Sequence, residues 1–168
     1  MVEVVYFKTP LSRYTFDSPK IMDWIVKHCT DKYVLNLFAG KNKLSHCCEE
    51  VRNDKDVTMN ADHHMDALNF VKAYPRFQPC RLFEVVVLDP PYSFRKSMEM
   101  YNGHRASRFN QVKDALPTIL VPDGRVITFG YHSVSMGMSR GFEQEEILLM
   151  SHGGAIHDTI AVVEKRIK

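Results

Sequence analysis

The stretch Val85–Tyr92, VVVLDPPY, is the part of this sequence that decides the fold. Three valines and a leucine in succession are typical of a strand that is buried on both faces of a parallel sheet. The strand ends abruptly, without a spacer, in an acid, two prolines and an aromatic residue. A buried strand that ends in so stiff and polar a segment raises the question of what this segment binds.

Strand and helix patterns alternate along the rest of the chain. Helices are expected over Ser18–Cys29, with Ser18 as cap and Pro19 in the first turn, and over Leu44–Glu50, Ala67–Tyr74 (closed by Pro75) and Lys113–Leu120. Strands are expected over Tyr33–Phe38, Val51–Asp56, Phe83–Leu88 and Arg125–Gly130, the last opened by a turn at Pro122–Gly124, and over Glu146–Met150 and Thr159–Lys165. This order predicts an α/β fold with a mostly parallel sheet, flanking helices and a C-terminal antiparallel hairpin.

The composition is that of an ordinary globular protein. The chain has 168 residues, 45% of them hydrophobic and 25% charged, which predicts a single domain over residues 1–168. A net charge of +2 is too small to indicate a nucleic-acid binder by itself. The four cysteines form no C-x-x-C pair, which favours a reducing, cytoplasmic location. Neither a signal peptide nor a membrane span is expected.

Two unusual loops follow predicted strands. One is Asn36–Gly40 and the other is Asp89–Tyr92. Ligands of open α/β sheets bind outside the carboxyl ends of the strands, so both loops are expected to face one crevice.

These two loops together resemble a family. LNLFAG followed by VVVLDPPY is similar to the S-adenosylmethionine-dependent amino-methyltransferases, whose first motif resembles D-x-F-x-G and whose fourth is [DNS]-P-P-[YFW]. The segment TFDSPKIMDWIVK resembles the part of the family that reaches the cofactor from the N-terminal side, which implies Thr15, Phe16 and Pro19. The resemblance implies a class I, Rossmann-like methyltransferase fold, S-adenosylmethionine as cofactor, and the motif order of the adenine-type enzymes.

The resemblance also implies a binding site for the methyl donor. The first loop would supply Asn36, Phe38, Ala39 and Gly40, with Gly40 allowing close approach of the backbone. Many relatives have an acid at the position of Asn36 and a second glycine where this chain has Lys41-Asn42-Lys43. The two lysines either hold the donor's carboxylate or are solvated.

A carboxylate at the end of the second strand would hold the ribose of the donor. Asp54 is the expected residue, and Asn60 or Asp62 takes the role if Val57–Met59 forms the strand instead. Asp66 either meets the adenine amine or caps the following helix.

In the family, D-P-P-Y activates an exocyclic amine, whose lone pair is conjugated into the ring. The Asp89 carboxylate and the Pro90 carbonyl would accept the two amine hydrogens, with Pro90 and Pro91 restricting the backbone that aims them. Tyr92 would stack on the base, a contact worth roughly 1–3 kcal/mol. The alternative is a plain turn in which Tyr92 is partly buried.

A basic segment follows this motif and indicates a nucleic-acid partner. Phe94 could contact a base, and phosphates could bind Arg95, Lys96, Arg105 and Arg108. The expected activity is methylation of an exocyclic amine. Adenine N6 is the expected target, and DNA is favoured over RNA as the substrate. The chain offers no room for a separate target-recognition domain. Either specificity is short and carried by loops, a second subunit of a homodimer or a specificity subunit supplies it, or the substrate is single-stranded or structured RNA. The rival interpretations are an RNA base methyltransferase, a protein-glutamine methyltransferase and a non-catalytic donor-binding subunit.

No metal site is expected, because His63 and His64 are adjacent and would point to opposite sides of a strand.

Overall fold

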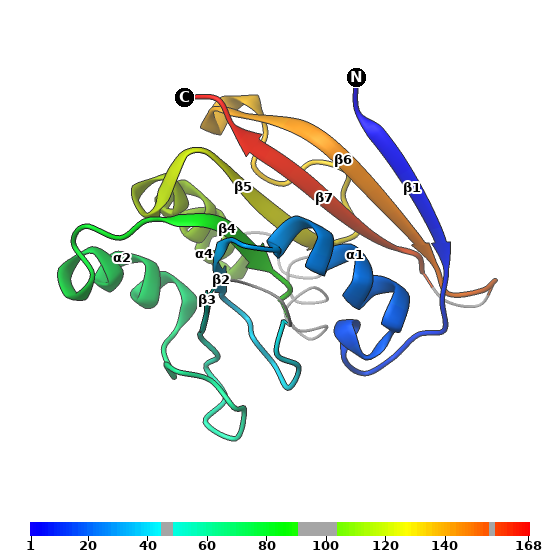
Figure 1. Cartoon of the computed structure of the whole chain (residues 1–168), viewed down its shortest axis with the longest axis horizontal. Coiled ribbons are helices and arrows are strands. Elements are labelled where there is room, and N and C mark those ends of the chain that lie inside the picture. Colours follow the sequence, from blue (N-terminus) through cyan, green and yellow to red (C-terminus); the bar gives the residue numbers. More distant parts are fainter. Residues whose placement is uncertain (45–48, 91–103, 155–156) are drawn as a thin grey trace.

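A seven-stranded sheet forms the centre of the molecule in a computed structural model, which describes residues 1–44, 49–90, 104–154 and 157–168, without the side chains of residues 104–107 (Figure 1). The order across the sheet is β1-β6-β7-β5-β4-β2-β3. The strands are β1 (Glu3–Lys8), β2 (Tyr33–Asn36), β3 (Glu49–Arg52), β4 (Phe83–Leu88), β5 (Leu120–Gly130), β6 (Phe142–Ser151) and β7 (Thr159–Arg166).

The sheet is mostly parallel, as the sequence predicts. The pairs β2–β3, β2–β4, β4–β5 and β1–β6 are parallel, whereas β7 runs antiparallel to both β5 and β6. The expected C-terminal hairpin is therefore confirmed as β6 and β7. Because these strands are parallel, the carboxyl ends of β2, β3, β4 and β5 all lie at the same end of the sheet, called the carboxyl edge below.

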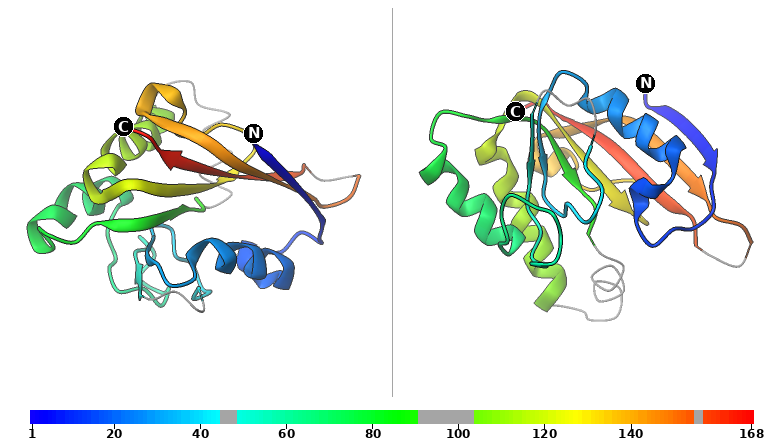
Figure 2. Two further views of the ribbon diagram at one scale, coloured as in Figure 1. Left: turned by 45° about the horizontal axis from the view of Figure 1, so that its top comes forward. Right: turned by 60° about the horizontal axis from the view of Figure 1, so that its bottom comes forward.

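Helices cover both faces of the sheet. Helix α1 (Pro19–Cys29) packs on one face, and α2 (Ala67–Phe77) and α4 (His104–Ala115) pack on the other (Figure 2). The described residues also form the short 3-10 turns η1 (Thr15–Asp17), η2 (Leu116–Ile119) and η3 (Met138–Arg140). Among the described residues, no helix is long and apolar enough to cross a membrane.

Strand β4 shows why its sequence has no polar alternation. Val85 and Val87 belong to the core beneath α1, while Val86 and Leu88 belong to the core beneath α2 and α4. Successive side chains of a strand point to opposite faces, so a central strand with helices on both sides needs apolar residues at every position.

The N-terminal half of the chain departs from the prediction in two places. Strand β1 was not expected, although its apolar centre Val4–Phe7 has strand character. It forms the edge of the sheet beside β6. The helix expected over Leu44–Glu50 is wrong at its end, because Glu49 and Glu50 begin β3, and residues 45–48 lie outside the described part of the chain. Strand β3 accordingly ends at Arg52, earlier than the expected Asp56.

Prolines explain the other differences. Pro75 does not close α2: it lies in the last turn, and the helix continues to Phe77. The helix expected over Lys113–Leu120 ends at Ala115, since Pro117 tightens the chain into a 3-10 turn. The expected turn Pro122–Gly124 is a bulge inside β5, where pairing with β4 jumps from Leu120 to Arg125.

Candidate functional site

A pocket of about 770 Å³ lies at the carboxyl edge of β2, β3 and β4. The register between the three strands sets Asn36 level with Arg52 and Val87, so the loops that follow them start side by side. Phe38, Ala39 and Gly40 line the pocket together with Asp89 and Pro90, so the two unusual loops do meet in one crevice. The other lining residues are Arg13, Tyr14, Thr15, Phe16, Leu37, Lys41, Asn42, Asn53, Asp54, Lys55, Asp56, Met59, Met65, Asp66, Ala67, Leu68, Arg108 and Val112.

Most residues expected to hold the donor lie in this pocket. Its walls include Thr15, Phe16, Phe38, Ala39, Gly40, Asp54 and Asp66. Two expected residues do not line it. Pro19 is the first residue of α1, and Asn36 is fully buried, with its Nδ2 donating to Glu50 Oε1 at 3.1 Å. Asn36 Oδ1 has no hydrogen-bond partner within the described part of the chain.

Gly40 gives the first loop its shape. Its φ of +55° lies in the left-handed region that glycine adopts without steric cost, and an added Cβ would meet Tyr14 Cδ1 at an ordinary 4.0 Å. Its N–H donates to Asp54 Oδ2 at 2.8 Å. This N–H therefore serves to hold the neighbouring loop.

Asp54 is the acid that follows the second strand. Because β3 ends at Arg52, neither Asn60 nor Asp62 inherits that place. The carboxylate of Asp54 accepts from Gly40 N through Oδ2 and from Asp56 N at 2.9 Å through Oδ1. The Asn60 carbonyl and the Asp62 carboxylate instead accept from Arg52, at 2.9 Å from Nε and 2.8 Å from the main-chain N. Two main-chain donors thus fix the orientation of the Asp54 carboxylate in the pocket.

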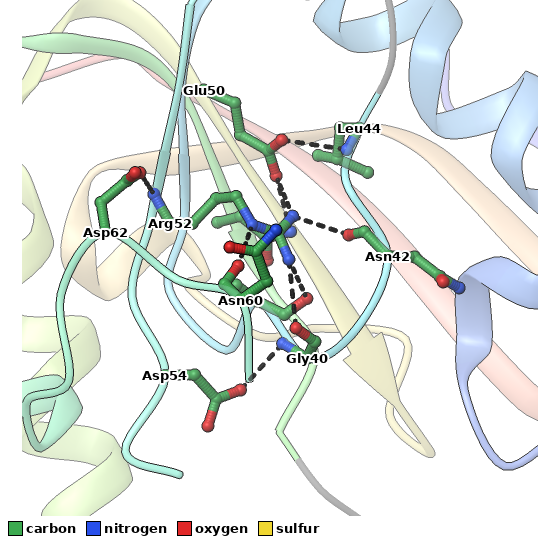
Figure 3. A network of polar contacts seen from close by, with 10 residues as sticks. Gly40, Asn42, Leu44, Glu50, Arg52, Asp54, Asn60 and Asp62 are labelled. Carbon is green, nitrogen blue, oxygen red and sulfur yellow. Dashed lines mark hydrogen bonds and ion pairs between the residues drawn. The ribbon is translucent and has the colours of Figure 1, made fainter. Parts of the chain in front are cut away.

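Arg52 lies behind the first loop and was not foreseen from the sequence (Figure 3). Its side chain is only 5% exposed and forms an ion pair with the buried Glu50, with 2.9 Å between Nη1 and Oε1. The guanidinium also donates to the main-chain carbonyls of Ala39, Gly40, Asn42 and Asn60, at 3.3, 3.1, 2.7 and 2.9 Å. A buried arginine is unusual enough to be a signal, but the run EEVRND gives no indication from sequence that Arg52 is buried.

Asn53 is the second residue that the sequence did not reveal. It is buried, and its Nδ2 donates to the carbonyls of Leu37 at 3.2 Å and Met65 at 3.0 Å. Its Oδ1 accepts from Met65 N at 3.1 Å. One amide side chain therefore ties together the loops that follow β2 and β3 on either side of the pocket.

Asp66 combines the two roles that the sequence left open. It is the N-cap of α2 and accepts from Asn69 N at 3.4 Å through Oδ1, and it also lines the pocket. The same oxygen forms an ion pair with Arg108 Nη2 at 3.1 Å. Arg108, expected to bind substrate, therefore lies beside a residue expected to bind the donor, and the pair joins α4 to α2.

Asp89 and Pro90 follow directly after β4. Asp89 is half-buried, Pro90 is buried, and both line the pocket. The other residues of the motif and of the basic segment, Pro91, Tyr92, Phe94, Arg95 and Lys96, lie outside the described residues, as does the side chain of Arg105.

The charges on the pocket wall are mixed. Among the described residues, the wall carries the carboxylates of Asp54, Asp56, Asp66 and Asp89 and the cations of Arg13, Lys41, Lys55 and Arg108. The pKa of Asp56 lies below its usual value because its carboxylate accepts from the main-chain N–H and the hydroxyl of Thr58. Beside them the wall carries apolar groups such as Phe38, Met59 and Met65. Such a wall suits a ligand that carries both charges and an apolar ring system.

None of the histidines that the structure describes lines the pocket. The ring of His63 packs on Phe70 and stacks on Phe77, with centroid distances of 5.2 and 5.6 Å. His64 Nδ1 lies 3.2 Å from the Asp54 carbonyl. Within the described ranges, no three histidine, cysteine or acidic side chains are grouped in a way that could hold a metal ion.

Comparisons with solved structures show which fold this is. A Streptococcus mutans protein assigned provisionally as a SAM-dependent methyltransferase matches with a TM-score of 0.64 and 13% identity, over 92% of this chain and 50% of that one. N-methyltransferase NodS from Bradyrhizobium japonicum WM9, in complex with S-adenosyl-L-homocysteine, matches with a TM-score of 0.58 and 12% identity, over 91% and 90%. TrmN from Thermus thermophilus matches with a TM-score of 0.57 and 14% identity, over 88% and 48%.

The chain spans about half the length of the first and third of these structures. No protein-family model matches the sequence. No curated protein matches it either. The shared architecture is that of the class I methyltransferases, and the fold expected from the sequence is confirmed.

Proposed function

We propose that this chain is an S-adenosylmethionine-dependent methyltransferase that acts on an exocyclic amino group of a nucleic-acid base, with adenine N6 in DNA as the preferred target. The observation that carries the proposal is the position of Asp89 and Pro90. They follow the central strand β4 and line the same pocket as the Phe38–Gly40 loop. The fold of methyltransferases and their complexes with S-adenosyl-L-homocysteine support the choice of cofactor.

The residues of the pocket fit such a donor. A volume of about 770 Å³ lies within the range of about 300–1,000 Å³ typical of sites for small molecules. The carboxylate of Asp54, aimed by two main-chain N–H groups, would accept the ribose hydroxyls. Asp66 would accept the adenine amine through Oδ2, since Oδ1 takes both the helix cap and Arg108. When bound, the donor would supply a methyl group activated by its bond to a positively charged sulfur, which leaves as a neutral thioether.

Asp89 and Pro90 would prepare the amine for attack. A carboxylate and a main-chain carbonyl that accept the two amine hydrogens draw the nitrogen lone pair out of conjugation with the base. The nitrogen would then bond to the methyl carbon as the carbon–sulfur bond breaks and S-adenosylhomocysteine leaves as a neutral thioether, and the methylated nitrogen would release one proton to solvent past Asp89. Because Pro90 has a restricted φ, these acceptors need no reorganisation during the reaction, which lowers its barrier. The remaining decrease of the barrier comes from holding the amine and the methyl group in position for reaction.

A nucleic acid is the proposed partner because cations stand at the mouth of the pocket. Arg108 is about half exposed although it pairs with Asp66, and Lys41 is exposed although it pairs with Asp17 at 3.9 Å. Phosphates attract such side chains whatever the base sequence. A base within a duplex would have to be extruded to reach Asp89.

Label transfer from tritiated S-adenosylmethionine tests this function. Wild type and Asp89→Ala are incubated with DNA unmethylated at adenine, with total RNA and with cell protein. We expect label in DNA with wild type alone, while both proteins bind S-adenosylhomocysteine equally in calorimetry. Label in RNA or protein would replace the proposed substrate, and equal transfer by Asp89→Ala would refute the role of the carboxylate.

A further inference from the structure

The guanidinium of Arg52 has a partner for each of its five N–H groups. Its acceptors are one carboxylate oxygen of Glu50 and four main-chain carbonyls, at 2.7 to 3.3 Å. Arginine is the side chain with five donors in a rigid planar fork, whereas lysine has three donors on a single nitrogen. The arrangement therefore requires arginine, and not only a positive charge.

Three of the four carbonyls belong to residues that line the pocket: Ala39, Gly40 and Asn42. The peptide unit between Ala39 and Gly40 is held on both sides. Its C=O accepts from Arg52 Nη2 at 3.3 Å, and its N–H donates to Asp54 Oδ2 at 2.8 Å. A trans peptide is planar, with its C=O and N–H pointing in opposite directions, so fixing the one aims the other. Figure 3 shows that the Arg52 guanidinium and the Asp54 carboxylate both reach the loop at Gly40.

Glu50 allows the guanidinium to be buried. Its side chain is 1% exposed, and besides Arg52 it accepts from Leu44 N at 3.0 Å and from Asn36 Nδ2 at 3.1 Å. A buried charge is tolerated when it is paired and its remaining hydrogen-bonding positions are filled. Asn36 is the third donor to the Glu50 carboxylate. An acid at this position would place a second buried negative charge beside Glu50. The departure at Asn36 from the first motif thus has a physical reason in Glu50.

We propose that Arg52 is a positioning residue of the donor site, which acts through the Ala39–Gly40 peptide on the carboxylate of Asp54. The inference rests on the proposed function, in which Asp54 holds the donor's ribose. Arg52 does not line the pocket, so its effect on the donor passes through the loop and not through direct contact. Without the guanidinium of Arg52, the carbonyl of the Ala39–Gly40 peptide is no longer held. The Gly40 N–H can then turn away from Asp54, whose carboxylate keeps only the Asp56 N–H as a donor that fixes its orientation.

Arg52→Lys tests the proposal, with Arg166→Lys as the matched control. Arg166 also donates to main-chain carbonyls, those of Pro117 at 3.0 Å and Leu120 at 2.6 Å, but these lie at the amino end of β5, away from the pocket. Titration calorimetry with S-adenosylhomocysteine measures the dissociation constant of each variant. We expect a rise of about tenfold or more for Arg52→Lys, because at least two of five hydrogen bonds are lost, and no change for Arg166→Lys.

A double-mutant cycle separates positioning from a general loss of structure. If Arg52 acts through Asp54, the rise in dissociation constant caused by Arg52→Lys is largely absent when Asp54 is already asparagine. Equal effects in both backgrounds would overturn the proposal, and so would an unchanged affinity of Arg52→Lys. If Arg52→Lys proves too unstable to titrate, Glu50→Gln, which removes the charge that holds the guanidinium, must raise the constant in the same direction. Wild type that does not bind S-adenosylhomocysteine would refute the proposed function itself.

Discussion

Replacing Asp54 with asparagine is expected to weaken binding of S-adenosylhomocysteine by about tenfold to a hundredfold. Both oxygens of Asp54 accept a main-chain N–H, from Gly40 at 2.8 Å and from Asp56 at 2.9 Å. Each oxygen keeps one further acceptor position for a ribose hydroxyl. Asparagine has a single acceptor oxygen, and its NH₂ group cannot accept a hydrogen bond. In the variant, the NH₂ group therefore faces either one of these main-chain N–H groups or a ribose hydroxyl of the ligand, and one of the hydrogen bonds to the carboxylate is lost. A hydrogen bond to a charged group is worth about 1.5–3 kcal/mol, and each 1.4 kcal/mol corresponds to about tenfold in affinity.

Titration calorimetry on folded protein measures the effect, with Glu84→Gln as control. Glu84 also accepts a main-chain N–H, from Tyr33 at 2.9 Å, and this bond keeps its pKa below the usual value. It lies near the amino end of β4, at the opposite end of the strand from the pocket. We expect Glu84→Gln to bind the ligand as wild type does. A change below about threefold for Asp54→Asn would show that its carboxylate does not touch the ligand, and the reasoning would fail.

Two further predictions concern stability. Burial lowers the pKa of His28 although Glu146 lies 3.2 Å away, so the folded chain prefers the neutral imidazole. Because the unfolded chain binds a proton at His28 more readily, the free energy of unfolding in urea should fall as the pH drops below 6.5. His28→Gln should make this decline less steep, and an unchanged slope would contradict the assignment. The hydroxyls of Tyr33 and Tyr74 form a buried hydrogen bond of 2.8 Å. Tyr74→Phe should lower the free energy of unfolding by about 1–3 kcal/mol because it leaves the Tyr33 hydroxyl unpaired, and adding Tyr33→Phe should recover part of the loss; a double variant less stable than the single one would count against this.

The sequence predicts the parts of the fold that depend on local pattern. The run Val85–Leu88, apolar at every position, was enough to place β4 in the centre of a helix-covered sheet. The capping signals at Ser18-Pro19 located α1 to within a residue, although the Ser18 hydroxyl bonds to Thr9 Oγ1 at 2.9 Å and does not cap the helix. The two loops at the carboxyl edge followed from topology alone.

What the sequence could not supply depends on contacts between distant residues. The edge strand β1 exists because it pairs with β6, more than a hundred residues away. Burial of Arg52 depends on Glu50, on the carbonyls of the loop after β2 and on Asn60, and charged residues in a short segment ordinarily indicate a solvated surface. Asn53 is likewise buried only because the carbonyls of Leu37 and Met65 meet at its amide. The buried hydrogen bonds of Glu50, Arg52 and Asn53 behind the pocket could therefore be identified only from the three-dimensional structure.

The position of the transferred methyl group tests the central claim most directly. DNA unmethylated at adenine is incubated with the chain and with S-adenosylmethionine that carries a trideuterated methyl group, then digested to nucleosides and analysed by mass spectrometry. The account predicts trideuteromethyl on the exocyclic nitrogen of adenine, and none with Asp89→Ala. Label on a ring carbon or on a ribose oxygen, or DNA without label from a protein that binds the donor, would contradict it.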